Sequence, residues 1–251
     1  MEMTDQLPTK LGKEPLIDAV FEVRFSSTAP ASDILPGFFF SKLSGCGIIE
    51  RLPIAQLPKP VRDADPNLQF SPLVRLSWNN FFISIGDSSL VIGCKIPYSG
   101  WSNFKPAIIE AVSCAMEIGI IQTVQRFSIK YIDLLSASSI RDQISLIRAS
   151  VVIGKHTLEQ ENFTLKIEVP MNGFFHIVHI ISSANALLAD GSKRDGIIVD
   201  IDTITTVNNQ EFQSWVTDLP EKLDTIHAAN KSMFFECLHP ETITSLEPVY
   251  E

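Results

Sequence analysis

The chain has 251 residues, of which 45% are hydrophobic and 20% are charged, a composition typical of a soluble globular protein. Its 29 Asp and Glu outnumber its 20 Lys and Arg, and the net charge of −9 argues against broad binding to nucleic acid or anionic membranes, which needs a basic surface. No uncharged apolar run reaches the ~20 residues of a membrane helix, so we expect no membrane association.

The cysteines predict free thiols rather than a metal site. Cys46, Cys94, Cys114 and Cys237 form no C-x-x-C pair, and each has apolar neighbours, as buried cysteines have in a reducing compartment. The polar N-terminal stretch has no apolar core of a signal peptide. We therefore expect a cytoplasmic protein without a metal or a cofactor.

The first elements in chain order alternate between strand and helix. Residues 1–14 predict a flexible polar tail, and residues 15–26 alternate apolar and polar side chains as a half-buried strand does. Residues 32–43 follow as a helix despite Pro36. Residues 45–67 carry four prolines and no periodicity, which predicts a long surface connector.

A meander and a helix come next. Strands at 73–78, 81–85 and 90–96 are separated by short turns, which predicts antiparallel pairing. Trp101 then leads into a helix whose apolar residues repeat every three or four positions up to Ile118.

The second part of the chain repeats this order. Its predicted elements are a strand at 123–135, a short helix at 139–148, strands near 150–154, 162–169, 173–182 and 196–206, and a helical region at 211–238 that Pro220 divides. A last short helix begins at His239-Pro240.

This order predicts an α+β fold with an antiparallel meander sheet and helices packed on one side. Strand, helix, meander and helix occur twice, so the fold is compatible with a duplicated β-α-βββ-α unit whose halves are 15–120 and 121–251. We expect the two halves to form one compact body.

Asp200 and Asp202 are the first candidates for a functional site. Two residues apart on a strand, they project from one face, while Val199 and Ile201 enter the core. Paired carboxylates can hold a cation or share acid–base work, and they equally suit a solvated sheet face with Lys166 as the cross-strand partner.

His227 and Asn230 are the second candidates, because a spacing of three places them on one helix face. If that helix packs beside the Asp200 strand, a His–Asp pair forms, which is an arrangement used for general-base catalysis. The alternative is that both side chains brace the helix against the sheet. The sequence alone assigns no catalytic residue.

The binding candidates are Glu22, Arg24, Arg126 and Trp101. The three charged residues lie on the polar faces of their strands, where they suit either a ligand groove or surface ion pairs. Trp101 stands at a loop-to-helix junction, where it can anchor a partner or hold the helix against the sheet.

Several segments together resemble a known family. They are Pro15–Phe25, Tyr98–Phe104, Arg126–Asp133, Val199–Asp202 and His227–Glu236. Their order and spacing resemble a sporadically distributed family of bacterial and archaeal proteins of this length, for which no activity is established. The family more often reads R-Y-I-N where this chain has Lys130-Tyr131-Ile132-Asp133. The resemblance implies an accessory gene, in a context of defence or of toxin–antitoxin type.

Two functions remain open at this point. The leading hypothesis is a non-catalytic protein-binding or adaptor module that engages a protein partner or its own copy. The alternative is a ligand- or metal-dependent enzyme whose pocket holds Asp200, Asp202, His227 and Asn230. Nucleic-acid binding is disfavoured by the net charge.

Overall fold

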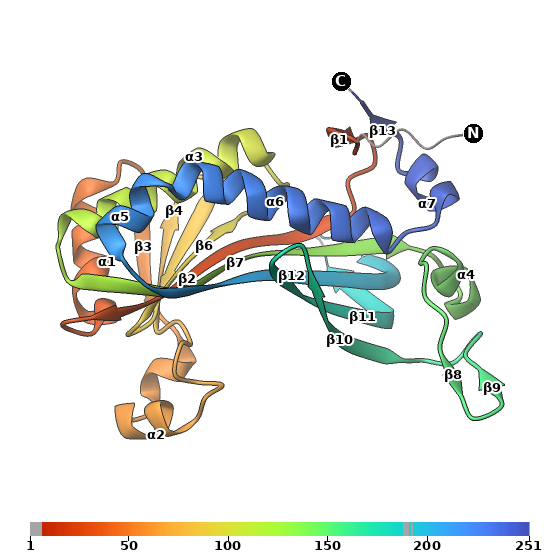
Figure 1. Ribbon diagram of the computed structural model, residues 1–251, viewed down its shortest axis with the longest axis horizontal. Coiled ribbons are helices and arrows are strands. Elements are labelled where there is room, and N and C mark those ends of the chain that lie inside the picture. Colours follow the sequence, from red (N-terminus) through yellow and green to blue (C-terminus); the bar gives the residue numbers. More distant parts are fainter. Residues whose placement is uncertain (1–6, 188–190, 192, 251) are drawn as a thin grey trace. The chain divides into compact units, whose positions relative to one another are not determined.

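The computed structural model describes residues 7–187, 191 and 193–250 (Figure 1). Its α+β fold is the one predicted, with an antiparallel sheet as the main element. The helices are α1 (Ala31–Lys42), α2 (Lys59–Ala64), α3 (Trp101–Glu117), α4 (Ile140–Ser145), α5 (Phe212–Thr217), α6 (Leu219–Glu236), α7 (Pro240–Ser245) and the 3₁₀ helix η1 (Pro53–Gln56).

Nine strands form the main sheet, in the order β10-β11-β12-β7-β2-β6-β5-β4-β3. They are β2 (Leu16–Ser27), β3 (Cys46–Arg51), β4 (Val74–Trp78), β5 (Phe81–Ile85), β6 (Ser89–Cys94), β7 (Ile121–Ser136), β10 (Thr164–Met171), β11 (Phe174–Leu187) and β12 (Lys193–Glu211). Two small sheets pair β1 (Lys10–Leu11) with β13 (Pro248–Val249) and β8 (Val152–Ile153) with β9 (His156–Thr157).

The strand order supports the repeated pattern of elements. Counted outward from the neighbours β7 and β2, the sheet continues as β12-β11-β10 on one side and as β6-β5-β4 on the other. On each side, three consecutive strands of a meander follow in reverse sequence order. The last strand of the meander (β12 or β6) lies nearest the centre, and the first (β10 or β4) lies farthest from it. Among the described strands, the edge strand β3 has no counterpart beyond β10 at the other end of the sheet.

Two compact units divide the chain, and each is discontinuous. Unit 1 contains the residues up to Asp18 together with Lys130–Thr203 and the chain from His227 onward, and unit 2 contains Ala19–Ile129 and Ile204–Ile226. The halves 15–120 and 121–251 stay a prediction. Residues 1–6 of the predicted tail lie outside the described residues, and the rest of that tail includes β1.

Unit 2 places a helix layer on one face of its strands. Phe21, Val23 and Phe25 of β2 are fully buried and alternate with half-buried polar residues. Helices α1 and α3 pack against the strands, and α3 also contacts α5. Helix α2 lies apart from this layer (Figure 1). The period-2 pattern of the sequence therefore orients the sheet correctly.

The connector predicted at 45–67 is more structured than the sequence suggests. It contains β3, η1 and α2. Strand β3 has a register irregularity between Cys46 and Ile49, and five of its six residues are exposed. A bulged edge strand of this kind has no alternation of buried and exposed side chains, so no period-2 pattern marks it.

Unit 1 has its own apolar core between strands and helix. Val178 and Ile180 of β11, together with Val199 and Ile201 of β12, form one cluster with the C-terminal part of α6. Phe234 is one of the α6 residues in this cluster, and it is 7% exposed. Where β12 comes close to β7, only glycine fits, since a Cβ atom on Gly196 would lie 2.1 Å from a backbone oxygen.

Candidate functional site

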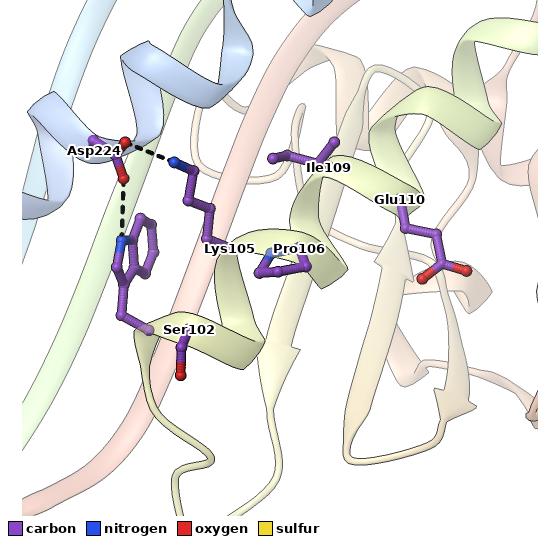
Figure 2. A pocket seen from close by; sticks show the side chains of 7 residues that line it. Ser102, Lys105, Pro106, Ile109, Glu110 and Asp224 are labelled. Carbon is purple, nitrogen blue, oxygen red and sulfur yellow. Dashed lines mark hydrogen bonds and ion pairs between the residues drawn. The ribbon is translucent and has the colours of Figure 1, made fainter.

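A surface hollow in unit 2 is the strongest candidate for a binding site. Its volume is about 590 Å³, which is within the range of ligand-binding clefts. The lining residues are Trp101, Ser102, Lys105, Pro106, Ile109 and Glu110 of α3 and Asp224 of α6. Figure 2 shows the α3 side chains along their helix, with Asp224 reaching in from α6.

The helical period explains why these residues share one side of α3. Phe104, Ile108 and Ala111 are fully buried and hold the helix against the core of unit 2. The lining residues occupy the other side in two rows at a spacing of four, 101-105-109 and 102-106-110. Gly100 precedes the helix with φ 86°, a conformation that favours glycine.

Asp224 fixes the polar margin of the hollow. Its Oδ1 accepts a hydrogen bond of 3.3 Å from Trp101 Nε1, and its Oδ2 pairs with Lys105 Nζ at 2.6 Å (Figure 2). The indole of Trp101 also packs edge-on against Phe104, with 6.2 Å between ring centroids. These contacts hold a large half-buried aromatic side chain in one orientation, so it is preorganised for contact with a partner.

The charges of the lining leave a negative excess. Lys105 is the one cation among the seven lining residues, and Asp224 and Glu110 are the two anions. Lys105 is already engaged by Asp224, whereas the exposed Glu110 has no ion pair among the described residues. The hollow therefore offers an apolar surface beside one carboxylate.

The structure joins the other three binding candidates into one cluster. Glu22 Oε1 accepts a hydrogen bond from Arg24 Nε and lies 3.4 Å from Arg126 Nη2. Their side chains are 20–26% exposed, and the Arg24 guanidinium stacks on Phe70 at 4.5 Å from the ring centroid. These contacts match the reading as surface ion pairs, since the carboxylate is occupied by the two guanidinium groups.

Asp200 and Asp202 lie on one face of β12, as the alternation predicts. Both are half-buried, while the alternating residues Val199 and Ile201 are buried in the unit 1 core. Asp200 pairs with Lys130 Nζ at 2.9 Å and lies 3.9 Å from His179 Nδ1. The expected partner Lys166 instead stands opposite His179 in the strand register.

His227 and Asn230 of α6 contact side chains on the opposite face, namely Tyr131 of β7 and Thr203 of β12. Asn230 is 1% exposed and donates from Nδ2 to the Ile201 carbonyl and to Thr203 Oγ1, each at 2.9 Å. His227 Nδ1 lies 3.1 Å from Tyr131 Oη. Asn230 thus braces α6 against β12, which is the structural alternative that the sequence left open.

The four residues of the enzyme hypothesis therefore do not converge on one pocket. The enzyme hypothesis pairs His227 with Asp200, whereas the histidine that lies beside Asp200 in the structure is His179. In the part of the chain that the structure describes, no group of three or more His, Cys, Asp or Glu side chains is placed to hold a metal ion.

Burial shifts the pKa values of several ionisable groups outside these clusters in the direction that favours the neutral form. Burial raises the pKa of the Cys114 and Cys237 thiols to about 11, so neither is a thiolate at neutral pH. Burial lowers the pKa of His176, which is fully buried and contacts Thr203 Oγ1 through Nδ1 at 2.9 Å. Asp133 is 6% exposed, and burial raises its pKa well above the ordinary value.

Sequence reasoning identified Trp101 but missed the rest of the hollow. Lys105, Pro106 and Ile109 follow from the helical period once Trp101 is chosen, because they lie on the side of α3 that faces away from its apolar stripe. Asp224 lies 123 residues from Trp101, and no local pattern links the two.

Comparisons of the chain with protein-family models and with curated proteins gave no match. Among the described residues, no helix is both long enough and apolar enough to cross a membrane. Class and site are therefore defined by the structure, as an α+β protein with an aromatic hollow between two helices.

Proposed function

We propose that this protein is a non-catalytic protein-binding module whose hollow receives an apolar side chain of a partner protein. One observation carries the proposal, namely the fixed, half-buried Trp101 in a hollow whose lining is mainly apolar and includes the charged residues Lys105, Glu110 and Asp224. Central aromatic anchors with polar rims are typical of protein interfaces, and tryptophan is enriched among the residues that dominate binding energy.

The geometry favours binding over the catalytic alternative. Asp200, His227 and Asn230 are each engaged in contacts that connect strands to one another or to α6. The lining of the hollow, in contrast, contains an exposed carboxylate and an exposed hydroxyl that are available to a partner. A cytoplasmic partner and an accessory role in defence or in a toxin–antitoxin context are parts of this proposal.

Site-specific photo-crosslinking tests the proposed function. A benzophenone amino acid in place of Ser102, which is exposed in the hollow, is expected to give one adduct of defined mass in native cells. The adduct is expected to disappear when Pro106→Lys is added, because that change places a positive charge in the apolar lining without altering a buried residue.

The matched control places the same crosslinker at Gln122, an exposed residue of β7 in the same unit. An adduct that forms equally at both positions, or that survives Pro106→Lys, would refute a specific site in the hollow. A protein that stays monomeric and forms no adduct at Ser102 would contradict the binding function itself.

A further inference from the structure

We infer that the segment bound in the hollow is an amphipathic helix of another protein, with apolar side chains one turn apart and a basic residue beside them. This inference rests on the proposed function and names the chemistry of the partner. The shape of the lining and its charge support it independently.

The shape of the lining favours a helical partner over an extended one. All seven lining residues lie on helices, so the lining itself presents no strand edge to a partner. An extended segment would find no free sheet edge there to satisfy its own N–H and C=O groups, whereas a helix satisfies them internally.

The length of the lining matches two turns of such a helix. From Trp101 to Ile109 the lining extends over nine residues of α3, whose eight steps of 1.5 Å span about 12 Å. Apolar residues at positions i and i+4 of the partner span about 6 Å, so both fit along Trp101, Pro106 and Ile109.

The charge of the lining selects a basic partner. Glu110 is exposed at one end of the hollow, and the whole protein carries a net charge of −9. A Lys or Arg beside the apolar residues gains an ion pair with Glu110, and an acidic residue there meets repulsion from both the site and the protein. A second copy of this acidic chain is a poorer occupant for the same reason.

Two synthetic helices of 16 residues test the inference with the full-length protein. Both carry leucines at i and i+4, and the remaining surface is rich in Lys in one and in Glu in the other. Binding is read from tryptophan fluorescence, because Trp78 and Trp215 are 2% and 0% exposed and Trp101 is the half-buried one. We expect the Lys peptide to bind and the Glu peptide not to bind.

Variants separate the two contributions. Pro106→Lys, which leaves the buried side chains unchanged and places a positive charge in the hollow, is expected to weaken binding of the Lys peptide strongly. Glu110→Gln is expected to weaken it by about 2- to 5-fold at low salt, as befits an exposed ion pair. Glu117→Gln on the same helix is the matched control and is expected to have no effect, since Glu117 pairs with Lys42 outside the hollow.

Equal binding of both peptides, or Lys-peptide binding that Pro106→Lys leaves unchanged, would overturn the inference. Self-association in sedimentation experiments that Pro106→Lys abolishes would overturn it in favour of a second copy. If the Ser102 adduct forms while neither peptide binds, the helical partner is wrong and the binding function stands; if the adduct is also missing, both fail.

Discussion

Replacing Asn230 with alanine is expected to lower the free energy of unfolding by about 2–4 kcal/mol. The side chain is 1% exposed, and its amide donates to Ile201 O and Thr203 Oγ1. Truncation removes both hydrogen bonds and leaves a small cavity against the strand. Thr203 keeps only its contact with His176, whose Nε2 already has no hydrogen-bond partner among the described residues.

Urea denaturation at neutral pH measures this loss, and Ser232→Ala on the same helix is the control. Ser232 bonds to Glu236 at an exposed position, so we expect its replacement to change the stability by under about 0.5 kcal/mol. The double variant Asn230→Leu with Thr203→Val removes both polar partners, and its cost is expected to fall short of the sum of the single changes. Strict additivity would show that the two side chains do not act as one network.

Replacing Asp133 with asparagine is expected to stabilise the protein by about 1–3 kcal/mol at pH 7. Burial raises the pKa of Asp133 well above its ordinary value, and the neighbouring carboxylates of Glu14 and Asp200 raise it further. Asparagine has the same shape and no charge to bury.

The stabilisation by Asp133→Asn is expected to depend on pH in a defined direction. A carboxyl whose pKa is raised by folding contributes stability below its unfolded pKa, near 4, and loses that contribution as the pH rises through the folded pKa. The variant should therefore gain little over wild type near pH 4 and progressively more at higher pH, up to about 1.4 kcal/mol per pH unit.

Thermal unfolding of both proteins at pH 4.5, 6 and 7.5 measures the effect. Comparing the two proteins at each pH cancels the titration of other groups, among them His176. Glu168→Gln removes the same charge from an exposed strand position and is the control. A stabilisation of the same size at every pH, or in both variants, would attribute the gain to net charge and not to the burial of Asp133.

Most of the fold could be predicted because its strands alternate cleanly. Phe21, Val23 and Phe25 enter the core of unit 2, and Val199 and Ile201 enter that of unit 1, so the period of two located both strands and their buried faces. The division of the last helical region also followed the sequence, since Pro220 fits the first turn of α6.

The parts that escaped prediction depend on tertiary contacts. Strand β3 and helix α2 bury few side chains, so neither shows the periodicity that reveals an element. Asp200 contacts Lys130 and His179 because β12 lies between β7 and β11 in the sheet. No local sequence pattern predicts this strand order. Trp101 could be selected as a lone aromatic, but its partner Asp224 depends on the position of α6.

The division of the chain into two units has a consequence for fragment design. The polypeptide passes between the units within β2, β7, β12 and α6, so four covalent crossings link them. No single cut releases either unit whole: a fragment covering residues 19–129 would lack Phe212 and Trp215, which pack on Phe25 and Phe127. Truncated or circularly permuted versions of this protein must therefore keep all four crossings. Deletions that remove one of them would also disrupt the packing around the hollow, so point substitutions are the better way to map it.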